Sequence, residues 1–222
     1  MTDSNPKLNL FCKSLEASFK HGLLVNKNNH NYFDVFEAIA AVEDKSQVIG
    51  LHALIKHVVN EISKIKCLQT SGGRGRYFLR CCLNNGWLSS LITSIRNWRD
   101  IDKWYANDAV LMRTPNESVM DVLPELDTLH FDLHLANRSF LDTSWDLPVY
   151  RKYELVPCTD LGLMIANASG RIVVTKVKPY SVAGEDGKVG VGDVIDEIDA
   201  TPTFGRRPED VAEIVKKCGA RR

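Results

Sequence analysis

Two histidines lie four residues apart in the run His130-Phe131-Asp132-Leu133-His134. On a helix, this spacing would bring both imidazoles to one face, where they could bind a metal ion. However, no glutamate follows the first histidine as in the H-E-x-x-H pattern, and no third ligand is evident. We therefore expect a surface or packing role for this pair, with no metal site and no cofactor.

A glycine-rich run, Gly72-Gly73-Arg74-Gly75-Arg76, invites comparison with phosphate-binding loops. It lacks the G-x-x-x-x-G-K-[ST] spacing and does not follow an expected strand. The G-x-S-x-G pattern of a nucleophilic serine is also absent from the sequence. Nothing in these patterns supports catalysis, so we expect a protein that is not an enzyme and has no catalytic residues.

Arginines are the notable charges of the first half of the chain. Arg76 and Arg80 are four residues apart and would share one helix face. Such a face could make bidentate contacts with an acidic partner. The alternative, which we favour, is pairing inside the domain, because arginines that flank a core often act as internal ties. The internal carboxylates considered are Glu16, Asp34 and Glu37, and the candidates for partner binding are Arg74, Arg76, Arg80 and Lys56.

The composition is that of a globular protein. The 222 residues include 28 basic and 28 acidic side chains, and 44% of the residues are hydrophobic. This balance excludes a disordered polyelectrolyte and a nucleic-acid binder held by bulk positive charge. Polar residues interrupt every apolar run well short of a membrane span, and the first residues do not resemble a signal peptide. The six cysteines form no C-x-x-C pair, so we expect reduced thiols and a cytoplasmic protein that partners could recruit to membranes or the cytoskeleton.

The apolar pattern changes near residue 148. Before this point the apolar residues recur at helical spacing, which predicts six to eight helices and little or no strand. Pro124 is expected to break or kink a final apolar stripe that runs from Val119 to Leu133. The helical stripes include Leu8, Phe11, Cys12, Leu15 and Phe19, then Leu51, Leu54, Ile55, Val58, Ile62 and Ile65, and then Leu88, Leu91, Ile92 and Ile95.

After residue 148 the pattern is that of short strands. Strands are expected at 153–156, 161–165, 172–177 and 193–198, separated by turns rich in glycine. A helix is expected from Glu209 to Lys217, with Pro208 in its first turn and Gly219 after its end. The sequence therefore predicts a multidomain chain, with an all-helical domain at 1–148 and a small β-rich domain at 149–222.

The first domain resembles a RUN domain, the helical module of many small-GTPase effectors. The strongest block is Gly73-Arg74-Gly75-Arg76-Tyr77-Phe78-Leu79-Arg80, which resembles G-R-x-R-A-W-L-R and departs from it at Tyr77-Phe78. The other blocks follow in family order over residues 8–145. They are Leu15-Glu16 with His21-Gly22-Leu23, Tyr32 to Glu37, Trp104-Tyr105 with Ala109-Val110-Leu111, and Leu126 to Phe131 with Leu141-Asp142.

The second domain resembles a PDZ domain, a β-sandwich with one groove helix. Asp160-Leu161-Gly162-Leu163 lies where that family has its carboxylate-binding loop, and the run Asp186 to Ile195 resembles the D-G-x-L-x-x-G-D-x-I signature. A PDZ domain normally has one more strand after this helix, whereas the sequence stops at Arg222. We therefore expect an incomplete domain, either truncated or completed by another segment.

The PDZ resemblance implies a groove in which a peptide C-terminus adds a strand beside Leu163–Ala166. The backbone N–H groups of Leu161–Leu163 would bind the terminal carboxylate, and Gly162 would permit the tight turn. Pro208 lies where a histidine would read a ligand serine or threonine, so that specificity is not expected. The groove residues implied are Leu161, Gly162, Leu163, Met164, Ile165, Ala212 and Val215; a simple core role for the apolar members is the alternative.

Together, the two resemblances imply a non-enzymatic adaptor that links membrane traffic or signalling to a scaffold. The helical half would bind a Rab, Rap or Arf-like GTPase in its GTP form, or a motor or trafficking protein. The β-rich half would bind the C-terminus of a membrane or cytoskeletal protein, or an internal segment. The alternative is a self-associating structural unit whose groove is occluded.

Overall fold

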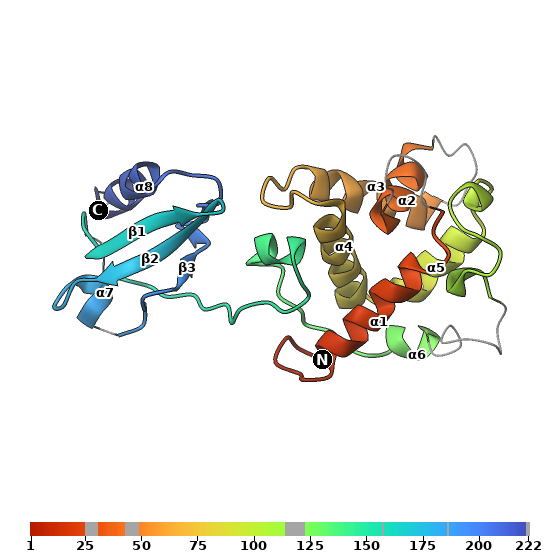
Figure 1. Ribbon diagram of the computed structural model, residues 1–222, viewed down its shortest axis with the longest axis horizontal. Helices are drawn as coiled ribbons and strands as arrows, with labels where there is room; N and C mark the ends of the chain where they lie inside the picture. The colour runs from red at the N-terminus through yellow and green to blue at the C-terminus, as the bar shows by residue number, and fades with distance from the viewer. Residues whose placement is uncertain (25–30, 43–48, 114–122, 157, 186, 221–222) are drawn as a thin grey trace. The chain divides into compact units, whose positions relative to one another are not determined.

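The chain forms two compact units, Met1–Pro148 and Val149–Arg222, in the computed structural model (Figure 1). The structure describes residues 1–24, 31–42, 49–113, 123–156, 158–185 and 187–220. The first unit is helical and the second contains a small antiparallel sheet, which confirms this part of the predicted fold class. None of the helices within the described ranges is long and apolar enough to cross a bilayer.

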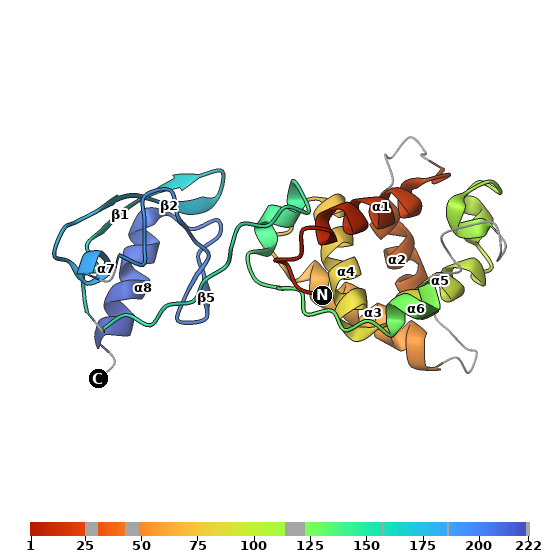
Figure 2. The ribbon, with the colours of Figure 1, turned by 90° about the horizontal axis from the view of Figure 1, so that it is seen from below.

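The helical unit is built around α4 (Ser71–Asn85). This helix packs against α2 (Tyr32–Ala41), α3 (Ile49–Ser63), α5 (Leu88–Arg96) and the 3-10 turn η4 (Arg138–Asp142) (Figures 1 and 2). The remaining elements are α1 (Leu8–Lys20), η1 (Ile101–Lys103), η2 (Val110–Met112) and α6 (Leu123–Asp127). The predicted stripe of α1 is confirmed: Leu8, Cys12, Leu15 and Phe19 are buried, and Phe11 is partly buried.

The glycine-rich run begins α4 and serves close packing. A Cβ atom on Gly73 would lie 2.1 Å from the Asp142 carboxylate, and one on Gly75 would lie 2.5 Å from the Tyr32 ring. Asp142 also accepts the N–H groups of Gln69 and Thr70, both at 2.9 Å. The glycines therefore let η4 and α2 approach the first turns of α4.

Arg80 of α4 is buried, with a side chain that is 1% exposed. Its guanidinium donates to both carboxylate oxygens of Asp3, at 2.6 and 2.8 Å, and to the carbonyl of His134. Asp3 also accepts the His134 N–H at 2.6 Å. These contacts hold the N-terminal residues and the segment around His134 against α4.

The predicted last helical stripe is wrong in part. Residues 119–122 lie outside the described residues, and α6 covers only Leu123–Asp127. Beyond it, the backbone N–H and carbonyl of Leu133 pair with the Asn84 side chain at 2.9 Å. Because both backbone groups are used in this way, the segment follows α4 in an extended form instead of continuing a helix.

The second unit contains a three-stranded sheet in the order β1-β2-β3 and a separate two-stranded ladder. In the sheet, β1 (Leu163–Ala168) and β2 (Arg171–Val177) pair antiparallel, and β2 also pairs with β3 (Val194–Ile195). The ladder joins β4 (Glu197–Ile198) to β5 (Thr201–Pro202). The described part of the unit also contains the helices α7 (Val182–Glu185) and α8 (Pro208–Ala220), and α8 contacts β1.

Several details of the predicted strands are wrong. Residues 153–156 form no strand, because their backbone pairs with none of the strands in the described part of the chain. The predicted strand at 193–198 is divided at Asp196, whose carbonyl accepts the Thr203 N–H. The structure also extends α8 through Gly219, where a Cβ atom would lie 2.2 Å from the Cys158 carbonyl. This glycine is needed for a close approach and does not end the helix.

We predict that Arg80→Met destabilises the helical unit by about 3 kcal/mol, because it removes the guanidinium that pairs with the Asp3 carboxylate and donates to the His134 carbonyl. Tryptophan fluorescence during urea unfolding measures this effect, since all four tryptophans (Trp87, Trp98, Trp104 and Trp145) belong to the helical unit. Arg99→Met is the control, because the Arg99 side chain is 80% exposed. Equal unfolding midpoints for the two variants would contradict a structural role for Arg80.

Candidate functional site

A groove lies between β1 and α8 in the second unit. It contains a partly open cavity of about 110 Å³, and we call it the β1–α8 groove. Its walls are mainly apolar, and Thr159 and Asp160 add polar groups. The residues that line it are Thr159, Asp160, Leu161, Leu163, Ile165, Ile195, Ile198, Pro208, Val211, Ala212 and Val215.

Strand β1 forms an edge of the described sheet, because β2 is the one strand with which it pairs there, and α8 contacts it. An edge strand presents backbone donors and acceptors that can pair with a further strand. Apolar side chains beside such an edge offer a pocket for alternate residues of an added strand. The arrangement can therefore accept an extended peptide.

The turn before β1 is fixed by close packing at Gly162. Its φ of +77° lies in the left-handed region, and a Cβ atom would be 2.1 Å from the Ser181 side chain. The Gly162 N–H donates to Asp160 Oδ1 at 2.8 Å, and Lys178 Nζ lies 3.2 Å from Asp160 Oδ2. These two donors lower the pKa of the Asp160 carboxyl, with the larger effect from the Gly162 N–H.

Most of the residues expected in the groove lie together. Leu161, Leu163, Ile165, Ala212 and Val215 line it, with Gly162 in the turn at its end. Met164 does not line it and is 51% exposed, since successive side chains of a strand point to opposite faces. Six lining residues were not in the predicted set: Thr159, Asp160, Ile195, Ile198, Pro208 and Val211. The helical spacing of Pro208, Val211 and Val215 was a signal for two of them.

In the helical unit, Arg76 is engaged internally. Its Nε donates to Glu16 Oε2 at 3.1 Å, and its Nη1 donates to the Leu141 carbonyl at 2.6 Å. The same Glu16 carboxylate accepts the Trp145 indole N–H at 2.6 Å and pairs with Lys20 at 2.8 Å. Burial alone would raise the pKa of Glu16, but the donors from Lys20, Arg76 and Trp145 outweigh burial and hold the pKa below its ordinary value.

The four candidates for partner binding therefore differ in accessibility. Arg76 and Arg80 are bound to carboxylates and carbonyls of their own unit, so several of their guanidinium N–H donors are already occupied. Arg74 lies over the Phe33 ring, with its Cζ 5.8 Å from the ring centroid, and its Nε is buried. Lys56 lies on α3 and is exposed. Of these four side chains, Lys56 is the one that a partner can reach most freely.

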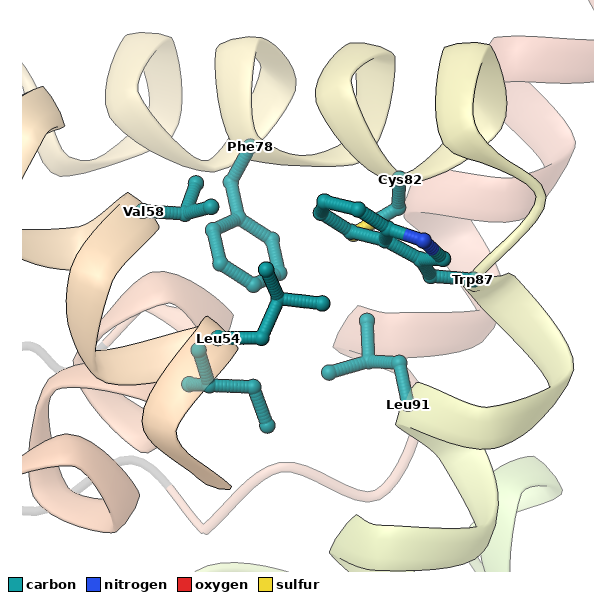
Figure 3. Close-up of a pocket in the computed structure, with 7 residues that line it drawn as sticks. Leu54, Val58, Phe78, Cys82, Trp87 and Leu91 are labelled. Atoms are coloured by element: carbon teal, nitrogen blue, oxygen red, sulfur yellow. The ribbon is translucent and has the colours of Figure 1, made fainter. Parts of the chain in front are cut away.

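A shallow apolar depression lies between α3, α4 and α5 (Figure 3). Leu54 and Val58 of α3 face Phe78 and Cys82 of α4, and Trp87 and Leu91 complete the lining. The cavity volume is about 10 Å³, which is about the space that one water molecule needs. It is a packing defect of the core surface and does not suit a small-molecule ligand.

Burial makes two of the thiols, Cys12 and Cys81, poor nucleophiles. All six cysteines are free, and burial raises the pKa of Cys12 to about 12 and that of Cys81 to about 11. Such thiols remain protonated at neutral pH and are poor nucleophiles. Among the described residues, no group of three or more histidine, cysteine or acidic side chains could hold a metal ion.

We predict that Glu16→Gln lowers the stability of the helical unit at pH 7 by about 3 kcal/mol, since Arg76 and Trp145 lose a buried anion. A carboxyl whose pKa is lowered by folding stabilises the native state above its ordinary pKa of 4.5, and this contribution is lost as the pH falls through the native value. The difference between the wild type and Glu16→Gln should therefore shrink below about pH 4.5.

Urea unfolding followed by tryptophan fluorescence at several pH values measures this difference. Glu61→Gln is the matched control, because Glu61 forms an exposed pair with Lys64 on the same unit. Its unfolding midpoint should stay close to that of the wild type. A constant difference between Glu16→Gln and the wild type from pH 7 to pH 3 would refute the role of the charged carboxylate.

Comparison with known proteins finds a family match within the helical unit. The sequence matches the RUN domain family over residues 10–137, which is more than half of the chain. A search of the curated proteins finds no match. The PDZ resemblance of the second unit remains a prediction. RUN domains are protein-interaction modules and not a family of enzymes. The chain therefore belongs to the RUN domain family.

Proposed function

We propose that the chain is a non-enzymatic adaptor whose helical unit binds a small GTPase of the Rab, Rap or Arf-like kind in its GTP form. The observation that carries this proposal is the RUN family match over residues 10–137. The GTP form is expected because the switch loops of these GTPases become ordered around the γ-phosphate. A motor or trafficking protein is the other class of partner for this unit.

The charges of the helical unit support a limited set of contacts. Since Arg76 and Arg80 are held by Glu16 and Asp3, the acidic switch loops would have to meet other cations. Lys56 is exposed on α3. A charge at the rim of an interface mainly affects the rate of association and its dependence on salt.

The expected result is GTP-selective binding by one member of a panel of Rab, Rap and Arf-like GTPases. Each GTPase is loaded with a non-hydrolysable GTP analogue or with GDP and tested against the immobilised full chain. Lys56→Glu should weaken the GTP-selective complex about tenfold, because the introduced negative charge would repel the acidic switch loops. Lys152→Glu, an exposed change in the second unit, should leave it unchanged. An absence of binding across the panel would overturn the GTPase proposal and favour a motor or trafficking partner.

We further propose that the second unit binds an extended peptide of a membrane or cytoskeletal partner in the β1–α8 groove. Two features support this: β1 has an edge beside α8, and an apolar cavity of about 110 Å³ lies next to that edge. A peptide C-terminus and an internal segment both fit this mode. They differ in whether a carboxylate or a neutral peptide group meets the Leu161–Leu163 turn.

Peptide binding by this groove is tested with Ala212→Trp. Ala212 lines the cavity from α8, so a tryptophan there fills the space that a ligand side chain would take. NMR titration of the 15N-labelled full chain with a library of ten-residue apolar peptides should perturb β1 and α8 in the wild type. Ala212→Trp should weaken the best complex at least about tenfold. Ala220→Trp, on the same helix but outside the lining, is the control. Perturbations that persist in Ala212→Trp would show that the peptide binds elsewhere.

A further inference from the structure

At one end of the β1–α8 groove, both oxygens of the Asp160 carboxylate are already bonded. Oδ1 accepts the Gly162 N–H at 2.8 Å, and Oδ2 lies 3.2 Å from Lys178 Nζ. Asp160 is itself one of the residues that line the cavity. The negatively charged Asp160 carboxylate therefore lies at the end of the groove, where one backbone N–H and one ammonium group bind it.

These two donors are among the groups that a negatively charged ligand would use at this turn. Gly162 is the middle residue of the turn that faces the groove, and its single N–H has only one hydrogen to give. The Lys178 side chain lies next to this turn, but its ammonium group already forms an ion pair with the Asp160 carboxylate. A free carboxylate that entered here would have to displace Asp160 from both donors or lie close to its charge. Two carboxylates that share one small site repel each other.

A neutral peptide group meets no such penalty. Its carbonyl can accept a remaining backbone N–H of the turn, and it adds no charge beside Asp160. The end of the groove is also open to solvent, because the Asp160 and Lys178 side chains are 69% and 55% exposed. A bound chain could therefore continue past the turn and leave the groove without ending there.

We infer that the β1–α8 groove takes an internal apolar segment of a partner chain and discriminates against a free C-terminal carboxylate, with Asp160 as the specificity-determining residue. This inference rests on the proposed peptide-binding function of the groove. It narrows that function from peptides in general to segments that are neutral where they meet the Leu161–Leu163 turn.

The test uses the full chain and the tightest-binding sequence of the peptide library, prepared in three forms. The first ends in a free carboxylate, the second in a carboxamide, and the third continues for four more residues before a carboxamide. For the wild type, the amide and extended forms should bind about tenfold more tightly than the free acid, because only the acid brings a second negative charge to Asp160. Raising the salt from about 0.05 to about 0.5 M should reduce this preference, since the repulsion is screened.

The variant Asp160→Asn removes the charge and keeps an oxygen that can accept the Gly162 N–H. It should bring the free acid to within about twofold of the amide, mainly by strengthening the binding of the acid. Glu154→Gln is the matched control, because Glu154 is an exposed acidic residue of the same unit that does not line the groove. It should keep the preference of the wild type.

The outcomes separate this inference from the proposal on which it rests. If the free acid binds the wild type as tightly as the amide, or more tightly, the inference is overturned and the peptide-binding function stands. An unchanged preference in Asp160→Asn also overturns it, because Asp160 would not be its source. If no form of any library peptide perturbs β1 and α8, the peptide-binding function itself fails.

Discussion

The helical unit depends on the neutralisation of two arginines that α4 carries into its interior. A buried guanidinium without a partner costs several kcal/mol, so each must meet an anion in good geometry. Arg76 meets Glu16 of α1, and Arg80 meets Asp3 near the N-terminus. Both also donate to carbonyls of the segment that closes the unit, at Leu141 and His134. Three distant parts of the sequence are thereby fixed to one helix.

The glycines of α4 allow its arginines to reach these internal partners. Because the arginines are used inside the unit, they are less available to a binding partner. Gly73 and Gly75 remove the side chains that would separate α4 from η4 and α2. The block that identifies the family by its sequence is therefore mainly a structural one: its glycines serve contact and two of its arginines serve internal pairing. If the unit binds a GTPase as proposed, we expect the contacts on exposed faces such as that of α3, which that block does not contain.

The features that could be predicted from the sequence are those set by a local pattern of apolar residues. The helical spacing located α1, and the β-branched run located β2, because each reflects burial of one face. The sequence offers Glu16, Asp34 and Glu37 as internal partners for the arginines, since a buried arginine needs a carboxylate, and Arg76 pairs with the first of them. The partner of Arg80 could not be predicted, because Asp3 is 77 residues away and precedes every expected element. Residues 153–156 alternate like a strand, but a strand exists only where another strand completes its hydrogen bonds.

The second unit has a much smaller core than the first, and this bears on how a ligand would act. Its buried apolar side chains in the described ranges are Ile172, Val174, Ala183 and Val211. Other apolar residues, including Leu163, Ile165 and Ile195, are only partly covered, because they face the β1–α8 groove. A peptide strand added at β1 would bury these side chains and pair the free edge of the sheet. Since a ligand that binds only the folded state stabilises it by mass action, occupancy of the groove and stability of the unit would rise together. The partly covered apolar surface of the groove would thus link the proposed peptide binding to the stability of the unit.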